Sequence, residues 1–178
     1  MNNVNKRLRL GLAVAALVLC LSAARADQEQ AEPILDSQFL ADATTSGNTA
    51  VQLSKLAVEQ ADNAKVKAFA HKQIKERTAL NDKIVDAGRG LKFGVDLVLE
   101  KERQTNYDQL SKLQGADFDR EYLKLIIDCH EKAVTLFERE AKTGTNADLI
   151  EVAGDSLPKI KEHLKEARAL RDGLKEKK

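Results

Sequence analysis

The sequence lacks the features that indicate a disulfide-stabilised, membrane-spanning or nucleic-acid-binding protein. Its only cysteines are Cys20 and Cys129. Cys20 lies in a segment that we expect to be removed, so packing rather than an internal disulfide must stabilise the mature chain. This segment, residues 1–26, contains four of the 29 basic residues and none of the 28 acidic ones. Its removal leaves a mature chain with a net charge of −3, which argues against a nucleic-acid partner. No run reaches the ~20 apolar residues that span a bilayer, so the mature chain has no expected transmembrane span.

Sequence motifs of the common enzyme classes are also missing. Residues 88–90 (Gly-Arg-Gly) follow no predicted strand and do not have the spacing of a phosphate-binding loop. Di-iron proteins of the ferritin type need Glu-x-x-His pairs, because that spacing places both ligands on one helix face. The positions three residues before His71, His130 and His163 hold Ala68, Ile127 and Ile160. We therefore expect neither a di-iron centre nor an enzyme.

The first 26 residues have the pattern of a secretory signal peptide. A basic start at residues 6–9 precedes an apolar run over residues 10–21, and Ala24-Arg25-Ala26 provides the small-x-small cleavage pattern. We expect the mature chain to begin at Asp27 and to work outside the cytoplasm. Residues 27–35 are polar, contain Pro33 and are expected to form a short tether before a folded domain over residues 36–175.

Apolar residues at helical spacing predict an all-α domain. The predicted helices cover residues 36–61, 64–87, 96–113, 117–142 and 146–174. Asp36 or Ser37 is expected to cap the first, and Pro158 to kink or interrupt the last. Nothing after the leader alternates for long enough to indicate a strand. Two long helical hairpins joined by a longer connection predict a ferritin-like up-down four-helix bundle, with the short additional helix in the crossover connection.

Four stretches of the chain resemble a known family of exported bacterial proteins, domain of unknown function 4142. These stretches are residues 52–70, 113–122, 130–144 and 157–170, and the more specific parts are Gly-x-x-Phe-Asp-x-x-Tyr and Leu-Pro-x-x-x-x-His-Leu. The resemblance implies a ferritin-like fold and a periplasmic location in a Gram-negative bacterium. Members are often labelled outer membrane proteins, so it also implies an association with that membrane. It assigns no biochemical role.

Two positions differ from what the resemblance implies. Relatives commonly carry an acidic-His pair where this chain has Glu76-Arg77, and a Glu where it has Gln52. Both differences replace metal ligands with residues that bind metals poorly or not at all.

His130 and His163 are the leading candidates for a functional site. His130 shares a helical stripe with Ile127 and Val134, and His163 flanks the stripe of the last helix, so both are expected to face one bundle interior. One hypothesis is a metal or proton-handling site, holding a divalent metal, with Glu131 or Glu59 nearby. The alternative is two buried histidines that bond carboxylates or backbone. His71 is expected near the surface.

Arg77 and Cys129 are the other polar candidates. Arg77 lies on the apolar stripe of the second helix, which predicts a partly buried guanidinium with Glu59 as its ion-pair partner. The alternative for Arg77 is a site for an anionic ligand in the bundle. Cys129 is either a buried free thiol or the link of a disulfide-bonded dimer.

The sequence as a whole favours a non-enzymatic envelope protein. We expect it to bind an envelope partner or itself through its helical surface, or to support stress tolerance. The alternative is a metal-binding bundle that uses His130 and His163 with nearby carboxylates.

Overall fold

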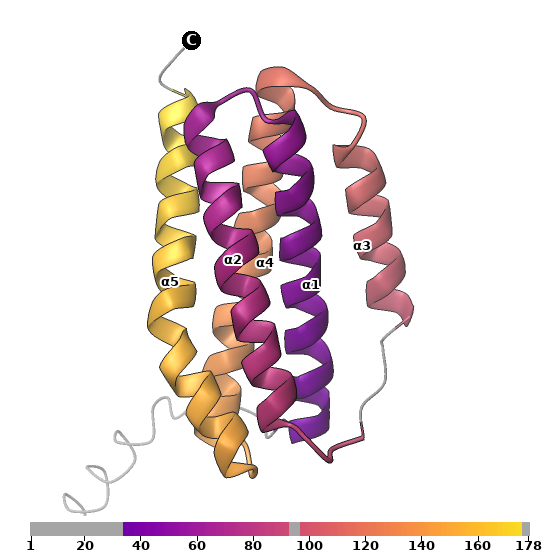
Figure 1. Cartoon of the computed structure of the whole chain (residues 1–178), viewed down its shortest axis with the longest axis vertical. Helices are drawn as coiled ribbons and strands as arrows, with labels where there is room; N and C mark the ends of the chain where they lie inside the picture. The colour runs from indigo at the N-terminus through magenta and orange to yellow at the C-terminus, as the bar shows by residue number, and fades with distance from the viewer. Residues whose placement is uncertain (1–33, 93–96, 176–178) are drawn as a thin grey trace, which may run out of the picture. The chain divides into compact units, whose positions relative to one another are not determined.

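The computed structural model describes residues 34–92 and 97–175, which form five α-helices (Figure 1). The helices are α1 (Asp36–Gln60), α2 (Ala64–Ala87), α3 (Leu97–Leu110), α4 (Gly115–Thr143) and α5 (Ala147–Lys175). The predicted all-α bundle is confirmed, with every predicted helix present. The expected signal peptide and most of the tether lie outside the described residues. Within them, no helix is long and apolar enough to cross a membrane.

Four long helices form the bundle, and α3 lies outside it. α1 and α2 make one antiparallel hairpin, and α4 and α5 make the other. α1 packs beside α4 and α2 beside α5, while α3 returns the chain along the bundle and touches α1 and α4 (Figure 1). The direction of the long helices is therefore up, down, down and up, which is the order that a long crossover connection produces.

Local signals set most of the helix ends where the sequence places them. The Asn63 side chain accepts a hydrogen bond from the Lys65 amide, and Asn146 accepts one from the Leu149 amide, so both act as N-caps. The expected cap at Asp36 and the expected interruption of the last helix at Pro158 were wrong. Asp36 is already in α1 and its carboxylate binds Thr145 across the bundle instead of capping its own helix. Pro158 lies inside α5, which continues across it.

The Gly-x-x-Phe-Asp-x-x-Tyr segment joins the start of α4 to the first hairpin. Gly115 has a φ of +58°, which favours glycine, and Phe118 is fully buried. The Asp119 carboxylate accepts hydrogen bonds from the backbone amides of Asp62 and Asn63, at 3.1 and 2.9 Å. Tyr122, the last residue of the motif, is buried with its hydroxyl 3.0 Å from that of Ser54, so each of the four named residues has a structural role.

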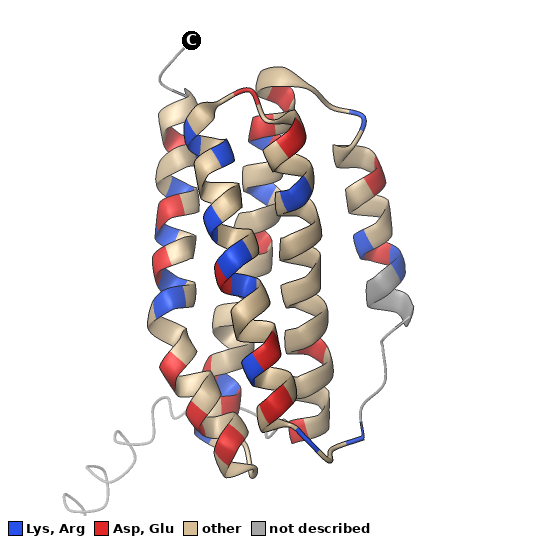
Figure 2. Cartoon of the chain, viewed as in Figure 1, with Lys and Arg blue, Asp and Glu red and all other residues tan. Residues whose placement is uncertain are grey.

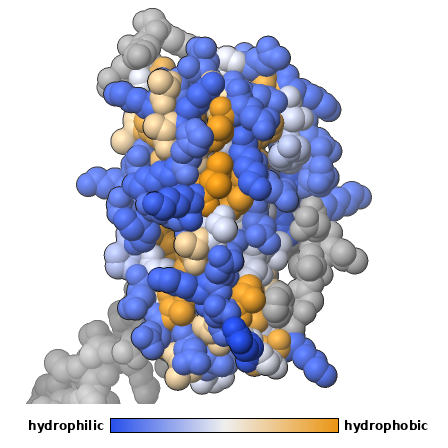
Figure 3. Space-filling view, viewed as in Figure 1, coloured by the Kyte–Doolittle hydropathy of each residue, from blue (hydrophilic) through white to orange (hydrophobic). Residues whose placement is uncertain are grey.

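The interior consists of two apolar clusters separated along the helix axes. The first includes Phe69, Tyr122 and Leu164, and the second includes Phe39 and Ile160. Ile34 belongs to the second, so packing begins before the end of the predicted tether. The outside carries charges of both signs, with apolar side chains showing as patches between hydrophilic ones (Figures 2 and 3).

Candidate metal centre

A layer of buried polar side chains lies between the two apolar clusters. We call Gln73, Arg77, His130 and His163 the polar layer. On each helix these positions fall between residues of the first cluster and residues of the second. Their relative exposures are 0, 2, 0 and 1%, so α2, α4 and α5 bury polar groups at one level of the bundle. Polar groups in such a place normally form hydrogen bonds, because an unsatisfied one costs about 1–3 kcal/mol.

His130 has one engaged ring nitrogen and one free ring nitrogen. Its Nδ1 lies 2.8 Å from the carbonyl oxygen of Ile126, one turn earlier on α4. A carbonyl only accepts, so the hydrogen-bond network assigns the proton to Nδ1 and leaves a lone pair on Nε2. Nε2 is buried and no protein group bonds it. Burial, and then the charge of Arg77, lowers the pKa of His130 to about 3, so the ring is neutral at physiological pH.

His163 repeats this arrangement from the adjacent helix α5. Its Nε2 lies 2.5 Å from Oε2 of Glu76 on α2, and its Nδ1 is buried without a protein partner. Burial lowers the pKa of His163, against the opposing effect of the Glu76 hydrogen bond, so the neutral ring donates from Nε2 and carries its lone pair on Nδ1. The ring also packs edge-on against Phe69, with centroids 6.5 Å apart.

The two imidazoles are direct neighbours. Their centroids are 5.7 Å apart with an interplanar angle of 73°. Two imidazoles that share one ion hold their ligating nitrogens within about 4 Å of each other, because each bond to the ion is about 2.0–2.1 Å long, so the rings must be direct neighbours as they are in this layer. Metal-binding histidines characteristically donate their other N–H to a carboxylate or a backbone carbonyl, and these two rings donate to one of each.

Arg77 places a positive charge beside the histidines. Its Nε–H donates to no protein group among the described residues, and burial lowers its pKa to about 10. Its charge acts on both His130 and His163 and lowers the pKa of each. Among the contacts of the described residues, no carboxylate forms an ion pair with it, and the nearest acidic group in sequence is Glu76, which bonds His163.

The predicted ion pair between Arg77 and Glu59 is wrong. Glu59 is exposed near the last turn of α1. At a helical rise of 1.5 Å per residue, Arg77 lies about 20 Å along α2 from its start at Ala64. Because α1 and α2 are antiparallel, Glu59 faces the beginning of α2 and cannot reach the guanidinium.

The other predicted carboxylate also lies away from the histidines. Glu131 is exposed and forms an ion pair with Arg168 of α5, at 2.7 Å. Gln52 is exposed as well, so a Glu at this position would point to solvent. Within the described ranges, no three His, Cys, Asp or Glu side chains form a metal-ligand group. The structure therefore brings His130 and His163 together and leaves both predicted carboxylates outside.

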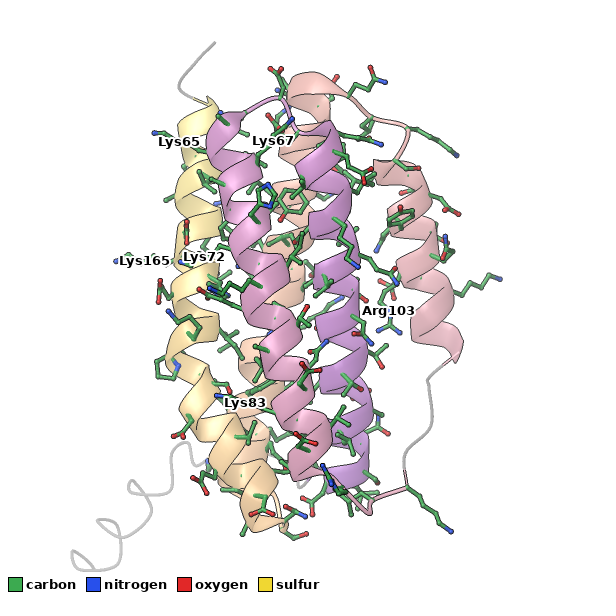
Figure 4. The ribbon with its side chains drawn as sticks, in the orientation of Figure 1. Lys65, Lys67, Lys72, Lys83, Arg103 and Lys165 are labelled. Atoms are coloured by element: carbon green, nitrogen blue, oxygen red, sulfur yellow. The ribbon has the colours of Figure 1, made fainter. Side chains whose placement is uncertain are left out.

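Cys129 lies beside the polar layer, because it precedes His130 on α4 and its thiol and Arg77 each affect the pKa of the other. It is partly buried in a groove of about 520 Å³ between α1, α3 and α4. Arg103 of α3 also lines the groove, and Figure 4 shows it between α3 and α1. Burial raises the pKa of the Cys129 thiol to about 11.

Sequence reasoning missed Glu76 as the partner of His163. The two residues are 87 positions apart, and only the register between α2 and α5 brings them together. Two nearby ion pairs are consistent with the same register, because Lys72 of α2 reaches Glu162 and Glu166 of α5 (Figure 4). The available signal was the position of Glu76 at the edge of the apolar stripe of α2.

Comparison with known proteins identifies the family and the fold. Residues 20–170 match the family described as domain of unknown function DUF4142, so the chain belongs to this family. No curated protein matches the sequence.

Several solved structures have a similar fold. CopM in its Cu(I)-bound form is 17% identical over 79% of this chain and 97% of that chain, with a TM-score of 0.63. CopM in its Ag-bound form is 18% identical over 79% of this chain and 97% of that chain, with a TM-score of 0.61. A secreted DUF305 protein from Streptomyces coelicolor is 17% identical over 79% and 92% of the respective chains, with a TM-score of 0.64. At these identities the likeness establishes the helical-bundle fold.

Proposed function

We propose that this member of the DUF4142 family is an exported, non-enzymatic helical bundle that binds a metal ion through His130 and His163. The observation that carries the proposal is the pair of buried, neighbouring imidazoles, each with one nitrogen engaged and the other free. Export follows from the signal-peptide pattern of residues 1–26. Periplasmic location and association with the outer membrane belong to the same proposal.

The residues present fit a metal ion. Neutral imidazole is a ligand for zinc, copper, iron and nickel, and both rings are neutral at physiological pH. Ile126 and Glu76 fix the tautomers that leave Nε2 of His130 and Nδ1 of His163 as donors. A bound ion would satisfy two buried lone pairs that otherwise cost folding free energy. CopM has a similar fold and is described in copper- and silver-bound forms, which is compatible with this proposal.

Elemental analysis of the mature protein tests the proposal. The protein is purified from the envelope without an affinity tag or a chelator, and its bound metals are counted per chain. We expect near-stoichiometric metal in the natural protein and loss of that metal in the His130→Gln/His163→Gln double variant. The matched control is His71→Gln, because His71 is exposed on α2 and takes no part in the centre.

A protein without bound metal would contradict the proposal. If no metal is bound and no added ion raises the melting temperature, the metal function is wrong. The protein would then return to the surface-binding role expected from its sequence, and cross-linking in the envelope would search for its partner or for self-association.

A further inference from the structure

We infer that the centre selects monovalent soft cations, the class of Cu(I) and Ag(I), over divalent ions, and that Arg77 sets this selectivity. The inference rests on the proposed metal-binding function and adds the class of ion that the centre accepts. Two features of the polar layer carry it: the number of free donors and the charge beside them.

The centre offers two imidazole nitrogen donors from the adjacent helices α4 and α5, and the buried Oε1 of Gln73 in the same layer is a carbonyl oxygen, a donor type that suits hard divalent ions rather than soft ones. His130 supplies Nε2 from α4 and His163 supplies Nδ1 from α5, and the other nitrogen of each ring is already engaged. Closed-shell monovalent ions of the copper group are stable with as few as two donors. Zn(II) takes four ligands in structural protein sites, and Cu(II) favours square-planar or tetragonal coordination. Two imidazoles therefore satisfy the monovalent class better than the divalent one.

The charges around the donors also favour a monovalent ion over a divalent one. Glu76 contributes one negative charge through its bond to His163, and Arg77 contributes one positive charge. Lys72 also faces His163, but Glu162 and Glu166 bind its ammonium group. With both rings neutral, Glu76 and Arg77 cancel, so a monovalent ion leaves one net buried charge and a divalent ion leaves two. A larger uncompensated charge is disfavoured in a buried site.

Arg77 repels an ion in proportion to the ion's charge. At the effective dielectric constant of a protein interior, about 20, a neighbouring unit charge changes affinity by about tenfold or more per unit of ion charge. Removing the guanidinium is therefore expected to strengthen Ag(I) binding about tenfold and Zn(II) binding about 100-fold. The ratio between the two gains distinguishes a charge effect from a general change in the fold.

Titrations with Ag(I) and Zn(II) in chloride-free buffer test the inference on the full mature chain, since both ions are redox-inert under these conditions. The variants are Arg77→Gln, which removes the buried charge, and Lys72→Gln, which removes a charge already bound by two carboxylates. We expect the natural protein to bind one Ag(I) at least about 100-fold more tightly than Zn(II), and Lys72→Gln to keep this preference. Arg77→Gln is expected to reduce it about tenfold.

The outcomes separate this inference from the function on which it rests. Zn(II) binding as tight as Ag(I) binding in the natural protein overturns the selectivity but leaves a metal centre. Equal gains for both ions in Arg77→Gln overturn the role of Arg77. Failure of the natural protein to bind either ion, together with the absence of bound metal in the elemental analysis, overturns the proposed function itself. The comparison of the two ions on the natural protein remains decisive even if Arg77→Gln does not fold.

Discussion

Asp119 joins the start of α4 to the turn between α1 and α2, and its replacement by Ala is expected to destabilise the whole bundle. The carboxylate accepts hydrogen bonds from the backbone amides of Asp62 and Asn63, and Asp119 itself is 2% exposed. A hydrogen bond to a charged group contributes about 1.5–3 kcal/mol, but burial of the carboxylate and the partial exposure of the turn offset part of this gain. We expect Asp119→Ala to lower the free energy of unfolding by about 2–4 kcal/mol.

Urea denaturation followed by far-UV circular dichroism measures this loss. Asp119→Asn is expected to cost less than Asp119→Ala, because the carboxamide keeps one acceptor and removes the cost of burying a charge. The matched control is Asp117→Ala on the same turn of α4, where the side chain is exposed and forms an ion pair with Arg120. This control is expected to change stability by less than about 0.5–1 kcal/mol. Equal losses for Asp119→Ala and Asp117→Ala would refute the role of Asp119 as the link between the two hairpins.

Three further predictions concern other parts of the bundle. Burial raises the pKa of Glu140 to about 7, above its unfolded value, so the stability that protonated Glu140 contributes is lost as pH rises between about 4 and 7. In urea titrations at pH 5 and 8, Glu140→Gln is expected to remove on the order of 3 kcal/mol of this pH dependence. An unchanged pH dependence in the variant would contradict this prediction. A methyl group at Gly47 would lie 1.8 Å from Oδ1 of Asn81, so Gly47→Ala is expected to lower the free energy of unfolding by about 1–3 kcal/mol, measured by thermal unfolding. The control Gly154→Ala places its methyl group in open space and is expected to leave stability unchanged or to raise it. Because the pKa of Cys129 is raised to about 11, its thiol is expected to react slowly with a disulfide reagent until urea unfolds the chain. Fast labelling of the native protein, or a dimer on a gel without reductant, would contradict a buried, unreactive thiol.

The helices were predictable because their signals are local. Apolar spacing, the Asn63 cap and the glycine at residue 88 are read within one or two turns, and α2 lies at Ala64–Ala87 as expected. The histidines were also predictable as interior residues, because the stripe of each helix identifies its buried face. Even a misplaced cap such as Asp36 left the extent of α1 nearly unchanged.

The partners of the polar side chains were not predictable from the same signals. The pairing of Arg77 with Glu59 failed because antiparallel register separates them along the helix axis, although both lie on one hairpin. The bond from His163 to Glu76 depends on the register between two helices that are far apart in sequence. Which nitrogen of each ring is free depends on those bonds, so the chemistry of the centre required the three-dimensional arrangement.

Imidazole nitrogen NMR is the measurement that tests the metal centre most directly. Long-range proton–nitrogen spectra of the metal-free protein identify the tautomer of each histidine, and the same spectra with Ag(I) identify the nitrogens that bind it. The predicted result is a proton on Nδ1 of His130 and on Nε2 of His163, with Ag(I) shifting Nε2 of His130 and Nδ1 of His163. Opposite tautomers, or an Ag(I) shift confined to the exposed His71, would contradict the proposed metal centre.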